Sequence, residues 1–304
     1  MLRFGHHRDL LWALALSVTP AMAAQPDLAV PYRGYVLPLS TYAPTPGRVA
    51  GVLLSVRVNG GPPLRLLLDT GAADVVLDKK AAERSGLVTS KDLVLVCAGG
   101  SSTKTLKAGM AQTVYVGPLT FRNYQVNVAP TKLGDGLDGV IPMSIFRGFL
   151  VRLDLPQKSL ELDPYPEGPP ASTEGFARAL PTEDLLFLPA TLNESKDGYV
   201  LIDTGSSYTA VSRPAARALK SLFTSAVQIM AADGAFTGEY ITPGVRFQIA
   251  GRELMANQVV ALDLSNMSRY HDIDVAGVLG FPDLRSKVLT VNYRDSLVKI
   301  ASGR

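Results

Sequence analysis

The residues best suited to chemistry are two aspartates in the same short sequence context. Asp69-Thr70-Gly71 follows the apolar run Leu66-Leu67-Leu68, and Asp203-Thr204-Gly205 follows Val200-Leu201-Ile202, 134 residues later. Two carboxylates that face each other can share a proton and activate a water molecule. Matching surroundings therefore predict a duplicated unit in which each half supplies one carboxylate.

Length and composition limit the classes of protein to which the chain can belong. It has 304 residues, of which 47% are hydrophobic and 19% charged, so it is typical of a globular protein with one large or two modest domains. The formal net charge is only +3 and is scattered along the chain. We therefore expect no nucleic-acid partner.

The N-terminus has the pattern of a secretory signal peptide. Basic residues lie between Arg3 and Arg8, the apolar stretch 10–18 follows, and Ala21-Met22-Ala23 provides a cleavage pattern. Residues 1–23 are therefore predicted to be removed, and retention as an anchor is the alternative. After removal one cysteine remains, which cannot form an internal disulfide. We expect a secreted protein, located in a bacterial periplasm.

The remaining side chains exclude several kinds of chemistry. After removal of the signal peptide only His271 and Cys97 remain of their types, so a zinc site with several histidines is excluded. A triad or pair that uses either residue stays open, but no nucleophile-elbow pattern accompanies them. No glycine-rich phosphate loop is present. We therefore expect no metal and no cofactor, and carboxylates remain for the chemistry.

An internal repeat extends well beyond the two tripeptides. A shift of 134 residues aligns about seventy residues without a gap, including Asn59 with Asn193 and Ala81-Ala82 with Ala215-Ala216. Farther on the offset grows by about four residues, which aligns Leu137-Asp138-Gly139-Val140-Ile141 with Val275-Ala276-Gly277-Val278-Leu279. The insertion falls around 266–274. The halves are therefore related copies.

The local patterns predict a mostly β protein with short helices. The strands expected in the first half are 52–58, 94–96, 113–116, 124–128 and 151–155, and the second half repeats the scheme. The helices are expected at 79–85, 143–146 and 213–222. These patterns place a first lobe at 50–163, an interlobe linker at 164–182 and a second lobe at 183–304. The Pro-rich segment 24–49 is either an extended lead-in strand or a short pro-segment.

These residues resemble the pepsin/retropepsin superfamily of aspartic proteases, in its bacterial, retropepsin-like branch with two lobes fused in one chain. Asp69-Thr70-Gly71-Ala72 is similar to the retroviral form of the catalytic motif, and Asp203-Thr204-Gly205-Ser206-Ser207 to the pepsin form. Gly139 and Gly277 lie in segments that resemble the family's hydrophobic-hydrophobic-Gly segment. The resemblance covers about residues 50 to 304. It implies an all-β, bilobal pepsin-like fold made of two duplicated retropepsin-like lobes.

The resemblance also implies roles for individual residues. Asp69 and Asp203 would be the catalytic pair, and Thr70 and Thr204 would hydrogen-bond across the lobe interface. Gly71, Gly205 and Ser206 would support the two loops, where glycine permits close backbone approach. Such a pair of aspartates activates water for attack on a peptide carbonyl, as in the general case of aspartic proteases.

The family holds its substrate under a glycine-tipped β-hairpin flap. Residues 93–106 fit such a hairpin, with Ala98-Gly99-Gly100-Ser101 at its tip. Asp233-Gly234 lies at the equivalent position of the second copy, and Asp-Gly favours a hairpin turn. The chain is therefore predicted to carry two flaps. The first flap region contains no tyrosine, which distinguishes it from pepsins.

The sequence as a whole predicts an aspartic-type endopeptidase that acts as a monomer on a peptide or protein substrate. A selective processing protease is a subclass of this prediction. The alternative is a non-catalytic peptide-binding or inhibitor module on the same fold. Cys97 is expected to be a small buried side chain, and His271 a solvated residue in a loop.

Overall fold

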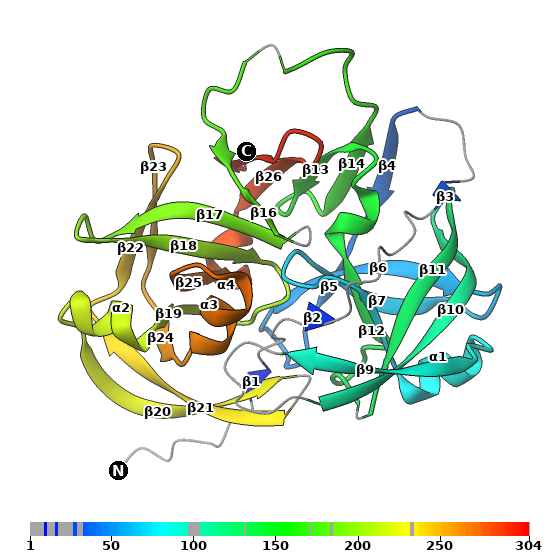
Figure 1. Cartoon of the computed structure of the whole chain (residues 1–304), viewed down its shortest axis with the longest axis horizontal. Helices are drawn as coiled ribbons and strands as arrows, with labels where there is room; N and C mark the ends of the chain where they lie inside the picture. The colour runs from blue at the N-terminus through cyan, green and yellow to red at the C-terminus, as the bar shows by residue number, and fades with distance from the viewer. Residues whose placement is uncertain are drawn as a thin grey trace.

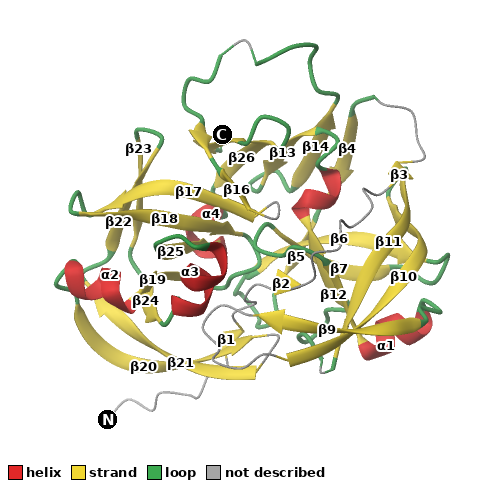
Figure 2. Cartoon of the chain, viewed as in Figure 1, coloured by secondary structure: helices red, strands yellow, loops and turns green. Residues whose placement is uncertain are grey.

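The computed structural model describes residues 9–10, 16–17, 27–28, 33–96, 104–130, 132–170, 172–182, 185–231 and 234–303. Strands predominate in this part of the chain, and the helices are short (Figures 1 and 2). The predicted mostly β fold class is therefore confirmed. Figure 1 shows the first half of the chain at the right, the second half at the left, and a third sheet above them.

The first sheet is built almost entirely from residues before 143. Its described strands follow the order β2-β9-β10-β11-β8-β12-β7-β6-β5, and β10 also pairs with β6 while β3 pairs with β11. Their bounds are β2 (Leu16–Ser17), β3 (Asp27–Leu28), β5 (Ser40–Tyr42), β6 (Gly51–Val58), β7 (Leu64–Asp69), β8 (Val75–Asp78), β9 (Thr89–Val96), β10 (Lys104–Val116), β11 (Leu119–Ala129) and β12 (Gly139–Pro142).

The second sheet repeats this arrangement and, apart from β1, is built from residues of the second half. Its described strands follow the order β1-β20-β21-β24-β19-β25-β18-β17-β22-β23, and β16 pairs with β17. Their bounds are β1 (Asp9–Leu10), β16 (Leu180–Thr182), β17 (Leu185–Leu192), β18 (Lys196–Asp203), β19 (Thr209–Ser212), β20 (Leu222–Ala231), β21 (Gly234–Thr242), β22 (Val245–Ile249), β23 (Arg252–Ala256), β24 (Val259–Leu262) and β25 (Val275–Gly280).

The third sheet draws its strands from both halves. Its described strands follow the order β15-β27-β26-β13-β14-β4, and β13 pairs with β26 between the halves. The bounds are β4 (Tyr35–Pro38), β13 (Leu150–Asp154), β14 (Ser159–Asp163), β15 (Ala177–Arg178), β26 (Lys287–Asn292) and β27 (Leu297–Ser302). The end of the expected linker thus forms β15 and β16, and part of the Pro-rich segment 24–49 forms β4 and β5.

The helices are α1 (Lys79–Arg84), η1 (Met143–Phe146), α2 (Arg213–Ala218), α3 (Ser265–His271) and α4 (Phe281–Leu284). The expected helix at 213–222 ends early, because β20 begins four residues after Ala218. The sequence patterns missed α3, which lies in the insertion and has no counterpart in the first half to indicate it. None of the described helices is long and apolar enough to cross a membrane.

The expectation of a solvated loop histidine at position 271 is wrong. His271 ends α3 and is partly buried, with its ring 4.8 Å from that of Phe187 between centroids. Its Nε2 atom is buried without a hydrogen-bond partner, and burial lowers the pKa of the imidazole. The insertion therefore packs a neutral ring onto the second lobe instead of extending into solvent.

Structural details repeat at the predicted offset of 134 residues. Asp78 caps α1 by accepting from the backbone N–H of Ala81 at 2.7 Å, and Ser212 caps α2 in the same way. Asn59 and Asn193 both adopt positive φ, and each side-chain oxygen accepts a backbone N–H at 2.8 Å. Because these residues make the same local contacts, the repeat is one of structure as well as sequence.

Candidate active site

Both aspartates stand at the ends of buried central strands. β7 ends at Asp69 with β12 running parallel beside it, and β18 ends at Asp203 beside the parallel strand β25. Leu66, Leu67 and Leu68 are fully buried, and the matching run before Asp203 is equally buried, so the strands are anchored within the lobes. The two carboxyls are only 3% and 2% exposed. The sheets therefore deliver one buried carboxyl from each lobe.

Four hydrogen bonds join the two Asp-Thr-Gly loops, defined here as residues 69–74 and 203–208. Thr70 Oγ1 donates to the carbonyl of Ile202 at 2.6 Å, and Thr204 Oγ1 donates to that of Leu68 at 2.8 Å. The backbone N–H of each threonine donates to the hydroxyl of the other, at 3.1 Å and 3.0 Å. All four are buried, so water does not compete with them. The predicted threonine contacts are thus present in the structure.

Each loop glycine lies against the aspartate of the opposite lobe. A Cβ atom added to Gly71 would lie 2.5 Å from Cγ of Asp203, and one added to Gly205 would lie 2.3 Å from Cγ of Asp69. No real Cβ tolerates such distances, so only glycine allows the carboxyls to approach. The structure therefore brings the two predicted aspartates and the two predicted glycines together around one point between the lobes.

The hydrogen bonds and burial of the aspartates determine their protonation. Asp69 accepts from the backbone N–H of Gly71 at 2.7 Å, and Asp203 accepts from those of Gly205 and Ser206, each at 2.9 Å. Burial nevertheless raises the pKa of Asp69 to about 6. Burial, followed by the charge and hydrogen bond of Asp69, raises the pKa of Asp203 well above its ordinary value. The two buried carboxyls therefore titrate as a pair that holds one proton, with both pKa values raised.

The residue after each glycine differs between the loops. Ser206 donates its hydroxyl to the carbonyl of Tyr208 at 2.7 Å and so closes the second loop on itself. Ala72 occupies the equivalent position in the first loop and is buried among apolar side chains. The hydroxyl of Ser206 thus supports the loop by bonding to its backbone. Among the described contacts, no hydrogen bond joins this hydroxyl to either carboxylate.

Arg48 is a site residue that the sequence patterns missed. It is exposed and lies in the turn before β6, and its guanidinium carbon lies 5.7 Å from the centroid of the Tyr208 ring. Tyr208 is the last residue of the second Asp-Thr-Gly loop. A side chain of the segment that precedes the first lobe thus lies over a residue of the second loop. No sequence signal indicated this contact, because the two residues are far apart in the chain and belong to no shared motif.

The stems of both predicted flaps are β-hairpins. β9 pairs with β10 up to Leu95 and Lys104, and β20 pairs with β21 up to Ala231 and Gly234. Gly234 begins β21. The predicted tip residues Ala98, Gly99, Gly100, Ser101 and Asp233, together with Cys97, lie outside the described residues, as does most of the predicted signal peptide.

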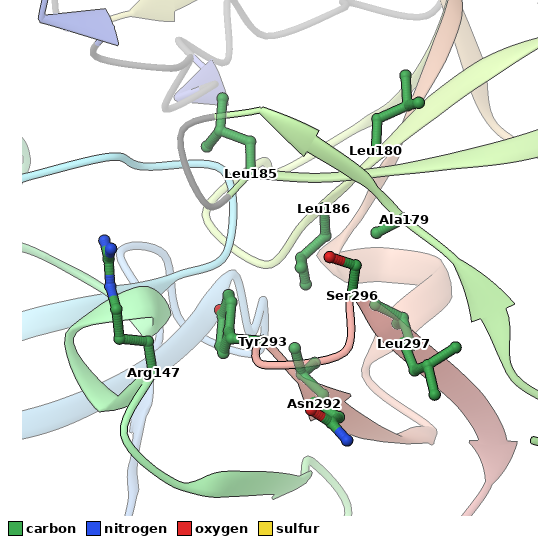
Figure 3. A pocket seen from close by; sticks show the side chains of 11 residues that line it. Arg147, Ala179, Leu180, Leu185, Leu186, Asn292, Tyr293, Ser296 and Leu297 are labelled. Atoms are coloured by element: carbon green, nitrogen blue, oxygen red, sulfur yellow. The ribbon is translucent and has the colours of Figure 1, made fainter. Parts of the chain in front are cut away.

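A cavity of about 230 Å³ lies elsewhere, between the start of the second lobe and the third sheet. Figure 3 shows Arg147 at one side of it and Leu180 and Leu297 at the other. No described residue of either Asp-Thr-Gly loop lines this cavity, so it is separate from the candidate site. Within the described part of the chain, no three His, Cys, Asp or Glu side chains are grouped as a metal ion would require.

Comparisons with known proteins agree with this geometry. Residues 54–145 match the family model described as aspartyl protease. The fold is similar to the crystal structure of the aspartic proteinase from Irpex lacteus, with a TM-score of 0.58 and 14% sequence identity over 89% of this chain and 97% of that chain. None of the curated proteins compared with the chain matches it.

The fold and the site define a class of two-lobed β proteins in which paired Asp-Thr-Gly loops meet at the lobe interface. The sequence match in the first lobe and the fold of the whole chain place it within that class. The first lobe is thus similar in sequence to aspartyl proteases, and the whole chain shares the fold of an aspartic proteinase.

Proposed function

We propose that the protein is an aspartic endopeptidase that uses Asp69 and Asp203 to hydrolyse peptide bonds with one activated water molecule. The observation that carries this proposal is the buried pair of carboxyls, which the two loops bring into hydrogen-bond contact across the lobe interface. Such a pair holds one proton between two acids, which provides a base and an acid at the same point.

In the proposed mechanism Asp69 is the base and Asp203 is the acid. The ionised Asp69 takes a proton from water as the oxygen attacks the carbonyl carbon of the peptide. Asp203, which keeps its proton because burial and the charge of Asp69 raise its pKa, hydrogen-bonds the carbonyl oxygen. The proton taken by Asp69 then passes to the departing amine as the C–N bond breaks. The products are a carboxylic acid and an amine, and no covalent intermediate forms.

The test replaces each aspartate separately. Asp69→Asn and Asp203→Asn, in the mature protein, retain the shape of the side chain and remove one titrating group. Each is expected to lower peptidase activity by three orders of magnitude or more, as loss of a central catalytic group does. Asp163→Asn, on the exposed face of β14, is the matched control and is expected to keep full activity.

A peptide-library digest over pH 3 to 8 provides the readout, with a statine-type transition-state mimic as inhibitor. Retained activity in either Asn variant would refute the shared-proton mechanism. Tight peptide binding without any cleavage by the wild-type protein would instead favour the non-catalytic module.

We further propose that the enzyme is secreted, resides in a bacterial periplasm and processes a narrow set of envelope proteins. The basic start, apolar stretch and Ala21-Met22-Ala23 pattern support export, and the single cysteine fits a compartment where no internal disulfide is needed. N-terminal sequencing of the exported protein should begin at Ala24. Comparison of envelope proteomes with active protein and with Asp69→Asn should reveal a few altered substrates; widespread degradation would contradict narrow selectivity.

The proposed assembly is a monomer. Both aspartates and all four threonine hydrogen bonds come from one chain, so the site is complete without a partner. Light scattering during size-exclusion chromatography should give the mass of one mature chain with full specific activity. Activity confined to a dimer peak would contradict this assembly.

A further inference from the structure

A polar cluster lies behind the second Asp-Thr-Gly loop and consists of Thr209, Gly280 and Asp283. Thr209 is fully buried, and its hydroxyl donates to Asp283 Oδ2 at 2.5 Å. The same hydroxyl accepts from the backbone N–H of Gly280 at 3.0 Å. A hydroxyl has one hydrogen to donate, so Asp283 determines its direction and leaves its lone pairs for Gly280.

The polar cluster touches the segment that supports Asp203. Gly280 stands opposite Asp203 in the parallel pairing of β25 with β18. The next residue, Phe281, donates its N–H to the carbonyl of Ser206 at 2.9 Å, and the N–H of Ser206 in turn donates to Asp203 Oδ1. A Cβ atom on Gly280 would lie 2.0 Å from the carbonyl oxygen of Tyr208. The position of Gly280 therefore bears directly on the loop that aims N–H groups at Asp203.

The first lobe has apolar residues at all three equivalent positions. Val75 begins β8 as Thr209 begins β19, and Pro142 stands opposite Asp69 as Gly280 stands opposite Asp203. Ile145, in η1, corresponds to Asp283 in α4. Val75 and Ile145 are buried in the main core, and Pro142 has no N–H to donate. The lobes thus support equivalent loops by different means.

Good packing alone would not favour a carboxyl at position 283, where the first lobe has isoleucine. A buried carboxyl is costly unless it is hydrogen-bonded, and burial raises the pKa of Asp283. The hydrogen bond from Thr209 and the charges of Arg285 and Lys287 act in the opposite direction. The polar cluster therefore keeps a partly buried acid where the first lobe uses isoleucine, in contact with the loop that carries Asp203.

We propose that Asp283 is a positioning residue for the second Asp-Thr-Gly loop, acting through Thr209 and Gly280. It keeps the N–H groups of Gly205 and Ser206 directed at Asp203. Because those N–H groups lower the pKa of Asp203, a displaced loop raises that pKa further. The kinetic part of this inference rests on the proposed peptidase function, whereas the titration of the carboxyls does not.

The test compares Thr209→Val, Asp283→Asn and Thr209→Ser in the full mature chain. Thr209→Val introduces the first-lobe residue and should lower kcat on the order of tenfold, the equivalent of one lost hydrogen bond, with KM unchanged within about twofold. The alkaline limb of the pH profile should move upward, since Asp203 must stay protonated. Asp283→Asn should show the same changes in smaller measure, and Thr209→Ser should restore wild-type values.

The control is Ile145→Val, which removes one methylene behind the first loop. It should lower the melting temperature without moving the alkaline limb. The carboxyl titration of Asp203, followed by carbon-13 NMR, should shift upward in Thr209→Val and not in Ile145→Val. This readout holds even if no peptide is cleaved, so failure of the proposed function can be told apart from failure of this inference.

Thr209→Val with wild-type kcat and an unshifted Asp203 titration would overturn the positioning role. So would a titration that shifts equally in Ile145→Val, because the effect would then reflect general loosening. A double variant, Thr209→Val with Asp283→Ile, reproduces both first-lobe side chains. This variant should remain folded, and its Asp203 titration should stay shifted upward. A wild-type Asp203 titration would show that apolar packing positions the second loop equally well.

Discussion

The second Asp-Thr-Gly loop has Thr209, Gly280 and Asp283 behind it, whereas the equivalent positions of the first lobe hold Val75, Pro142 and Ile145. At the interface itself the loops are alike, because each threonine hydroxyl donates one hydrogen bond and accepts another across the lobes. The two lobes therefore share the contacts that face the dyad and differ in those behind it. This difference shows that the two copies of the site need the same contacts at the lobe interface and can differ behind the loops.

Among the residues around the two aspartates, the largest effect is expected from the two glycines at the interface. Gly71→Ala and Gly205→Ala each place a methyl group within 2.5 Å of the opposite carboxyl carbon, so the carboxyls must separate. Both variants should lose peptidase activity about a hundredfold or more, the usual consequence of displacing reacting groups by about 1 Å. Steady-state kinetics measures this loss.

Gly148→Ala is the matched control, since a Cβ there meets nothing within 4 Å, and it should keep its activity. Near-normal activity in either Gly71→Ala or Gly205→Ala would show that the dyad tolerates a wider separation than the structure indicates.

The threonines provide the next test of the symmetry at the interface. Thr70→Val and Thr204→Val each leave a buried N–H and a buried carbonyl without a partner, at a cost of about 2–4 kcal/mol. Urea denaturation should give similar losses for the two variants, and the loss in the double variant should differ from their sum because the two residues are in direct contact. Clearly unequal losses would show that the interface is asymmetric.

The pH dependence of stability tests the shared proton. A carboxyl with a folded-state pKa raised from 3.8 to about 6 binds its proton more tightly in the folded state. The stability it contributes is therefore present below about pH 4 and is lost as the pH rises through about 6. The loss is on the order of 3 kcal/mol for Asp69, and the raised pKa of Asp203 acts in the same direction.

The double variant Asp69→Asn with Asp203→Asn removes both titrations. Its unfolding free energy relative to wild type should rise between pH 4 and pH 7 by that amount. A difference that does not change with pH would mean that the carboxyls titrate normally.

The smallest effect is expected at the turns remote from the dyad. Asn59→Ala and Asn193→Ala each remove a side-chain acceptor and place alanine at positive φ, so each should cost about 1–2 kcal/mol. Thermal unfolding of the two variants should show nearly equal shifts. A large effect in only one lobe would mean that the repeated turns do not contribute equally.

Much of the fold can be predicted from local sequence, because the same strand and helix patterns occur in both halves of the chain. The offsets align the capping residues Asp78 and Ser212, and the strand patterns located the hairpins that carry each aspartate. Local sequence overlooked α3, because its insertion is absent from the other copy. It also could not show that β13 and β26 form one sheet, since this pairing depends on contacts between residues far apart in the chain.

The sequence by itself determined that two Asp-Thr-Gly loops follow buried strands in equivalent halves, because residue types and spacing are local properties. Only the tertiary structure decided that the two carboxyls are buried against each other, which raises both pKa values, and which residues lie behind each loop. These properties depend on burial and on hydrogen bonds between segments such as Thr209 and Asp283, or Thr70 and Ile202. The first contact forms as the second lobe folds and the other as the lobes close on each other, and no spacing within either copy encodes them.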